Sequence, residues 1–354
     1  MTDGRKTAKK AGGMRRGRYR EEDYSYAAAK ASALSRELIS EQAQRELLRT
    51  LDAAGIESRL AEYGFNSSGD TETALTSYLA ERYDTLLSFC PSTPLARMCR
   101  LKYDCSNLKS AIKCAYGQRD PHPLMIECGC IPTEELIDAT ARRDYSDIAR
   151  VIPNMARGAE MAAAALEQSG ASRTVDSLLD RACFADMREA AAACGIREVA
   201  EIIERRTDQI NLLTAARVMR LRRAELRRAV FDDSVISGGR IDMAALRDAE
   251  DAATLGRLAA DAGYREMAEA LAKTDGTAAG LEALSLAFDN DMFTELAAMT
   301  SMKLLGAYPI IAYIAGLELE IKNLRIITSG IRAGEDRALI ESRLRTAQAH
   351  REVL

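Results

Sequence analysis

The chain has 354 residues, a length that allows two or three domains and a large buried core. It contains no Trp, 5% aromatic residues and only seven Pro, and this composition favours helix throughout. The longest apolar run, residues 304–317, contains Pro309 and is too short to cross a bilayer, so composition excludes an integral membrane protein. We predict a buried core helix there.

The N-terminal residues 1–23 differ from the rest of the chain. Residues 1–20 carry eight Lys or Arg against one acid, whereas the formal net charge of the whole chain is -4. This segment is rich in Gly and lacks apolar periodicity, which predicts a disordered basic leader. Such a leader could touch nucleic acid or anionic lipid, but Tyr19 is its one aromatic residue, and we predict no nucleic-acid binding. No secretory signal is readable, because acids follow the basic residues.

Apolar residues at helical spacing predict helices along the rest of the chain. They begin with a long helix from Tyr24, a second helix N-capped by Ser40, a third over residues 71–88 and a fourth over residues 95–116. Two prolines separate the third and fourth helices. No segment has a convincing strand pattern, so the predicted fold class is all-α.

One pattern recurs on three of the predicted helices: an acid, two variable residues, an Asn and a Leu. The copies start at intervals of 104 and 112 residues, and they contain three of the six Asn in the chain. Their polar residues are Asp104, Asn107, Asp208, Asn211, Glu320 and Asn323. On a helix these side chains share one stripe with the Leu, so they face the core.

Buried carboxylates and amides need hydrogen-bond partners. We therefore interpret the three acid–Asn pairs as structural anchors that tie each helix to a neighbour. The alternative is a catalytic or metal-binding carboxylate set, and no His accompanies any of the copies.

A second spacing of residues recurs before each copy of the acid–Asn pattern. Ile131 and Ile241 each follow a Gly by two residues and precede a Leu by five, whereas Ile39 precedes Gln44 by five. Asp180 precedes Phe184 by four residues, as Asp289 precedes Phe293. These repeats predict three helical units over residues 24–125, 126–237 and 238–354, in an open stack or a closed ring.

Catalytic equipment is missing from the sequence. No Gly-rich phosphate loop is present, and His122 and His350 fall in predicted loop or terminal positions, so we predict no catalytic residues and no cofactor. Cys128 and Cys130 lack a second cysteine pair, and we expect reduced thiols and no metal.

An enzymatic alternative is carried by a pair of adjacent acids. Asp232 and Asp233 resemble the start of an aspartate-rich metal motif, but Ser234, Val235 and Ile236 follow where further acids would be needed. We expect the two acids to mark the end of a helix.

The repeated motif helices, together with the tract from Tyr313 to Glu335, resemble the C-type subunit of bacterial and archaeal V/A-type ATPases, a relative of the d-type subunit of eukaryotic V-ATPases. The stretch 26–30, Tyr-Ala-Ala-Ala-Lys, is similar to the N-terminal start of that family. The likeness runs from Tyr24 to the C-terminus and does not include the basic leader. The family often has a basic residue six positions after the Asn. Lys113 and Arg217 match this feature, and Ser329 does not.

The resemblance implies three units in a pseudo-threefold funnel, whose base rests on the membrane proteolipid ring and whose mouth receives the D and F subunits of the central stalk. It implies a non-enzymatic torque coupler for ion transport, peripheral on the cytoplasmic face, which meets the membrane only through the ring. The alternative function is a helical-repeat adaptor that binds a peptide or protein partner.

Overall fold

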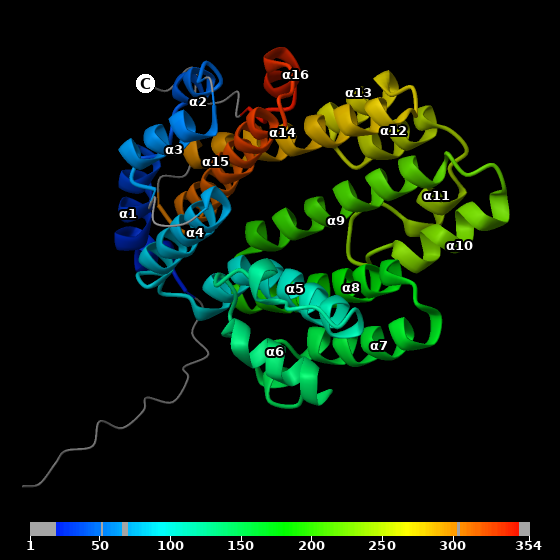
Figure 1. Cartoon of the computed structure of the whole chain (residues 1–354). Helices are drawn as coiled ribbons and strands as arrows, with labels where there is room; N and C mark the ends of the chain where they lie inside the picture. Colours follow the sequence, from blue (N-terminus) through cyan, green and yellow to red (C-terminus); the bar gives the residue numbers. More distant parts are fainter. Residues whose placement is uncertain (1–18, 51, 66–69, 303–304, 347–354) are drawn as a thin grey trace, which may run out of the picture.

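The computed structural model describes residues 19–50, 52–65, 70–302 and 305–346. Secondary structure in these residues consists of helices and contains no strand, which confirms the all-α prediction. Figure 1 shows the helices following one another around a ring, with α15 and α16 returning beside α2, α3 and α4.

The first third of the described chain contains one 3₁₀ helix and five α-helices. They are η1 (Glu21–Tyr24), α1 (Ser25–Ser35), α2 (Glu41–Leu47), α3 (Ala53–Glu62), α4 (Thr71–Leu87) and α5 (Thr93–Tyr116). Residues 1–18 of the predicted leader lie outside the described residues. Its last residues enter η1, and Tyr24 is buried.

The middle third continues the helical pattern. It contains η2 (His122–Leu124), α6 (Thr133–Arg142), η3 (Ile148–Arg150), α7 (Pro153–Ser169), α8 (Ser172–Cys194), α9 (Arg197–Val218) and α10 (Ala224–Ser234). The last third contains α11 (Met243–Asp248), α12 (Ala252–Asp261), α13 (Arg265–Lys273), α14 (Ala278–Met302), α15 (Tyr308–Arg332) and α16 (Arg337–Ser342).

Capping residues fix where the helices begin. The Ser40 hydroxyl accepts from the Ala43 N–H at 3.2 Å, so the predicted N-cap of α2 is confirmed. Helix α5 begins two residues earlier than predicted. Ser92 caps it, and Pro94 lies in the first turn, where backbone N–H groups have no partner within the helix, so a proline there costs no hydrogen bond. Of the apolar run 304–317, residue 304 lies outside the described residues, and residues 308–317 begin the buried helix α15.

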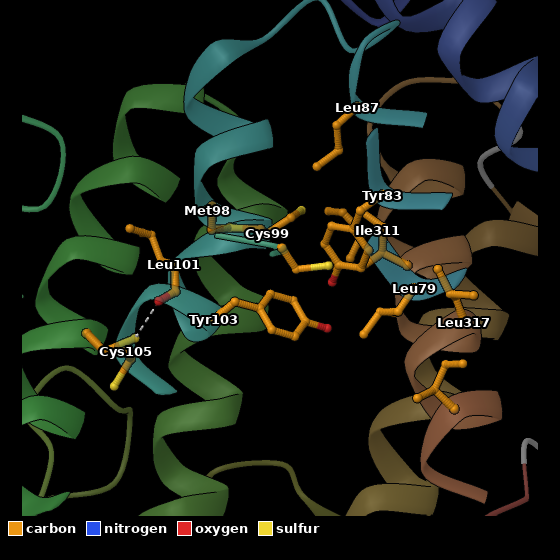
Figure 2. Close-up of a cluster of buried hydrophobic side chains, with 14 of the residues drawn as sticks. Leu79, Tyr83, Leu87, Met98, Cys99, Leu101, Tyr103, Cys105, Ile311 and Leu317 are labelled. Carbon is orange, nitrogen blue, oxygen red and sulfur yellow. Dashed lines mark hydrogen bonds between the residues drawn. The ribbon is translucent and has the colours of Figure 1, made fainter. Parts of the chain in front are cut away.

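Packing follows one rule around the ring. Helix α5 packs on α8, α9 packs on α14, and α15 packs on α1 and α4. The first two helices with the repeated motif therefore contact a long helix farther along the chain, and the third, α15, contacts helices near the start of the chain. Figure 2 shows α4, α5 and α15 meeting in the core, where the Tyr83 and Tyr103 rings lie edge to face with centroids 5.4 Å apart.

Candidate functional site

The first acid–Asn pair lies on the buried face of α5. Both Asp104 and Asn107 are fully buried. The Asp104 carboxylate accepts from the backbone N–H of Cys130 at 2.9 Å and of Ile131 at 3.1 Å. The Asn107 amide pairs with both backbone groups of Ile126, each at 2.9 Å. This pair therefore fixes the loop between η2 and α6 onto α5.

The second pair makes matching contacts on α9. The Asp208 carboxylate accepts from the backbone N–H of Arg240 at 2.8 Å and of Ile241 at 3.1 Å. The Asn211 amide pairs with the C=O and N–H of Ile236 at 2.7 and 2.9 Å. In addition, the Tyr264 hydroxyl donates to Asp208 at 2.8 Å, a contact that the sequence did not predict because Tyr264 lies 56 positions away.

The third pair joins the two ends of the described chain. The Glu320 carboxylate on α15 accepts from the Ile39 N–H at 2.6 Å. The Asn323 amide pairs with both backbone groups of Arg345 at 2.9 Å. It also donates to Gln44 at 2.9 Å.

The three sets, which we name the anchors, share one geometry. In each, the Asn amide satisfies the N–H and C=O of one loop residue, and the acid accepts the N–H of an Ile. In the first two anchors the loop residue and the Ile are five positions apart on one continuous stretch of chain. In the third, Arg345 and Ile39 come from opposite ends of the chain.

Glycine permits the close approach of chain and carboxylate in two anchors. A Cβ at Gly129 would lie 2.2 Å from an Asp104 oxygen, and a Cβ at Gly239 would lie 2.0 Å from an Asp208 oxygen. Glu37 occupies the corresponding position before Ile39. The acid of the third anchor is a Glu, whose longer side chain accepts from the Ile39 N–H.

Gln44, which differs from the Leu of the other two anchors, also has a structural reason. Leu136 and Leu246 stand at this position in the other two anchors, and both are buried and apolar. Gln44 is buried too, but its amide donates to the Ile39 C=O at 3.0 Å and accepts from Asn323. The Gln thus links the two halves of the anchor in which the chain is not continuous.

Burial sets the electrostatics of the three acids. It raises the pKa of Asp104 to about 6, although backbone N–H groups of Cys130 and Ile131 oppose the rise. It also raises the pKa of Asp208. The pKa of Glu320 rises to about 7, because only the Ile39 N–H and the charge of Arg82 oppose burial, and one Glu320 oxygen has no hydrogen-bond partner.

Ion pairs run beside the anchors from each motif helix to the long helix that it packs on. Lys109 and Lys113 of α5 pair with Asp180 and Asp176 of α8, each at 2.6 Å. Arg205 of α9 pairs with Asp291 of α14 at 2.6 Å.

On α15, Arg325 pairs with Glu72 of α4 at 2.5 Å. Arg325 follows the Asn by two positions, as Lys109 does, so α15 has its basic residue there and not at Ser329. Glu318 of α15 also accepts from Tyr83 and pairs with Lys102, which ties α15 to α4 and α5.

The remaining candidate sites do not gather into a reactive centre. The Cys130 N–H donates to Asp104, and Cys128 is a buried free thiol. His122 lies on the surface between Asp120 and Glu134. Asp232 and Asp233 are exposed near the end of α10, as expected for a helix end.

His350 lies outside the described residues. Among the residues that the structure describes, no three His, Cys, Asp or Glu side chains are placed to hold a metal ion.

No described helix is both long and apolar enough to cross a bilayer.

Comparisons with known proteins identify the family of this chain. A search of curated proteins finds no significant match. A family model described as ATP synthase (C/AC39) subunit matches residues 27–343. The match spans most of the sequence and confirms the resemblance to the C-type subunit of V/A-type ATPases, so this chain belongs to the ATP synthase (C/AC39) subunit family.

Proposed function

We propose that this chain is the non-catalytic rotor coupler of a V/A-type ATPase, which links the D and F subunits of the central stalk to the membrane proteolipid ring. It transmits torque between the ATP-hydrolysing head and the ion-transporting ring. Membership of the family supports a role in a rotary ATPase. The chain itself needs no nucleotide, metal or cofactor for this role.

The observation that carries the proposal is the third anchor. A torque-transmitting part must resist deformation, and a chain whose two ends are unattached would open under load. Glu320 and Asn323 bind residues near both ends of the described chain, Ile39 and Arg345, and so complete the ring of helices. Buried hydrogen-bonded networks of this kind rigidify a packed core.

The three matching anchors also favour a threefold plan. We propose that residues 24–125, 126–237 and 238–354 are related units around a pseudo-threefold axis, and that the anchor residues are structural. In this arrangement the base rests on the proteolipid ring at the cytoplasmic face, the mouth receives the D and F subunits, and contact with the membrane occurs only through the ring.

Copurification and transport measurements test the proposal. A tagged copy of the chain should copurify with the proteolipid ring and with the D and F subunits. Membrane vesicles that lack the chain should lose ATP-driven ion uptake, while the detached head continues to hydrolyse ATP. A helical-repeat adaptor would leave both the complex and the ion uptake intact, and that result would refute the coupler.

A further inference from the structure

The turn between α9 and α10 carries a concentration of arginine that the anchors do not use. Residues 217–228 contain six Arg and one Glu, a local charge of +5 in a chain whose formal net charge is -4. The six are Arg217, Arg220, Arg222, Arg223, Arg227 and Arg228. Arg227 is half-buried and the other five are exposed. We name these six residues the arginine turn.

Folding does not explain the arginine turn. Arg228 pairs with Asp248 at 3.2 Å, and the other five form no ion pair with any described residue. Arg223 and Arg227 are four positions apart on or beside α10, a spacing at which like charges repel. Within this chain the like charges are unfavourable, and an acidic partner would offset them.

The position of the turn suits contact with another molecule. Figure 1 shows it at the right-hand edge of the molecule, on the side away from α1. Two large apolar side chains are exposed on helices that pack together: Leu226 on α10 is 46% exposed, and Met243 at the start of α11 is 42% exposed. An exposed apolar residue among arginines in sequence matches the composition of a protein interface, which has an apolar centre and a polar rim.

The positive charge and the exposed apolar residue together indicate the chemistry of the partner. All six basic residues are Arg, in a chain that has 39 Arg and 10 Lys and no Lys between Lys113 and Lys273. A guanidinium binds a carboxylate or a phosphate through two parallel N–H bonds, whereas a Lys ammonium acts as a point charge. The exposed apolar Leu226 beside the guanidinium groups favours the carboxylates of a protein surface. Arg is enriched and Lys depleted at protein interfaces, while anionic lipid attracts both residues similarly.

We propose that the arginine turn is a docking surface for an acidic face of another protein, whose Asp and Glu carboxylates bind these guanidinium groups in a bidentate way around Leu226. The proposal rests on the proposed function only for the partner's identity, which would then be another component of the rotary complex. The surface and its chemistry follow from the described residues alone.

Photo-crosslinking tests the docking surface directly. Benzoylphenylalanine placed at Leu226 in the intact complex should form an adduct with a protein segment rich in Asp and Glu, identified by mass spectrometry. The same probe at Leu339 on α16, which is 44% exposed, is the matched control and should not give this adduct. If the Leu226 probe gives no protein adduct, the proposal is wrong.

Charge variants test the chemistry. Replacing the five unpaired arginines of the turn by Gln should weaken retention of the partner by about tenfold or more, with a steep dependence on salt. Replacing the same five by Lys keeps the charge and removes the bidentate geometry, so it should also weaken retention. A control set of five exposed arginines changed to Gln should leave retention unchanged. The control residues are Arg36, Arg49, Arg59, Arg119 and Arg157.

Two outcomes would overturn this chemistry. If the Lys variant retains the partner as well as the wild type does, bidentate carboxylate binding is refuted. If the purified chain binds phosphatidylglycerol vesicles or duplex DNA through the turn, and no protein adduct forms, the occupant is a membrane or nucleic acid. Failure of copurification with the proteolipid ring would refute the rotor coupler and leave an adduct with an acidic protein unaffected, so the two proposals fail separately.

Discussion

The Ile39 N–H donates to the Glu320 carboxylate at 2.6 Å, across 281 positions of sequence. One turn farther along α15, Asn323 binds both Gln44 and Arg345. Helix α15 therefore binds the beginning and the end of the described chain. The same two contacts are made at the other two anchors by a continuous stretch of chain, so the third anchor replaces a covalent connection by hydrogen bonds.

The Asn of an anchor should matter for stability more than an exposed amide. Replacing Asn211 by Leu leaves the buried N–H and C=O of Ile236 without partners, and we expect a loss of about 3 kcal/mol in the free energy of unfolding. Urea unfolding measures this loss. The exposed Gln42 changed to Leu should alter stability by less than about 0.5 kcal/mol.

The same Asn211 variant separates stability from catalysis. Its assembly with the stalk should weaken, while ATP hydrolysis by the detached head stays at the wild-type rate. Loss of that hydrolysis would contradict a purely structural role for Asn211.

Gly239 should tolerate no side chain while Asp208 is present. In Gly239→Ala the new Cβ would lie 2.0 Å from an Asp208 oxygen, so the loop must move, and we expect a destabilisation of about 3 kcal/mol. The double variant with Asp208→Ala removes the atom that clashes. The double variant should lose less free energy of unfolding than the two single variants lose together, by at least about 1 kcal/mol.

Thermal or urea unfolding of the wild type, the two single variants and the double variant measures these losses. Gly117→Ala is the matched control, because Gly117 is an exposed C-cap with an ordinary φ of −81°. Additive costs in the Gly239 and Asp208 cycle would show that the close approach to the carboxylate is not what requires glycine.

Stability should fall as pH rises through the titration of Glu320. Its pKa is raised from 4.5 to about 7, so the folded state binds the proton more tightly than the unfolded state does. The free energy of unfolding therefore decreases between pH 4.5 and about 7, by an amount on the order of 3 kcal/mol from this group.

Glu320→Gln removes this titration and keeps an oxygen that can accept from Ile39. The variant should match the wild type below about pH 4.5 and be more stable than it above about pH 7. Asp104, whose pKa is about 6, titrates in both proteins, so the difference between the two pH profiles reports Glu320 alone. Parallel profiles would refute the assignment.

A circular permutant tests whether the third anchor replaces a covalent connection. Joining residue 354 to residue 1 and opening the chain between Cys90 and Pro91 should give a folded protein. The 26 residues outside the described ends, 347–354 and 1–18, can span roughly 85 Å, and α15 is only about 37 Å long. Circular dichroism and cooperative unfolding check the result. An unfolded permutant would show that the anchor forms only with the original chain order.

The sequence anticipated the helices and the polar stripe because both depend on spacing within one segment. Asp208, Asn211 and Leu212 are all buried, as their positions on one helical face predict. The partners of these side chains could not be read in the same way. Ile236 lies 25 positions from Asn211 in a loop, and backbone groups of loops have no signature in the sequence. The arginine turn is six Arg in twelve residues of sequence, but only coordinates show that five of the six form no ion pair with any described residue.

Periodicity and composition by themselves determined that the chain is helical and that an acid and an Asn face inward on three helices. These properties follow from local backbone geometry, in which residues three or four apart share a face. Only the tertiary structure decided that the third anchor binds Ile39 and Arg345 together. Contacts between distant segments depend on how whole helices pack, and no local pattern contains that information.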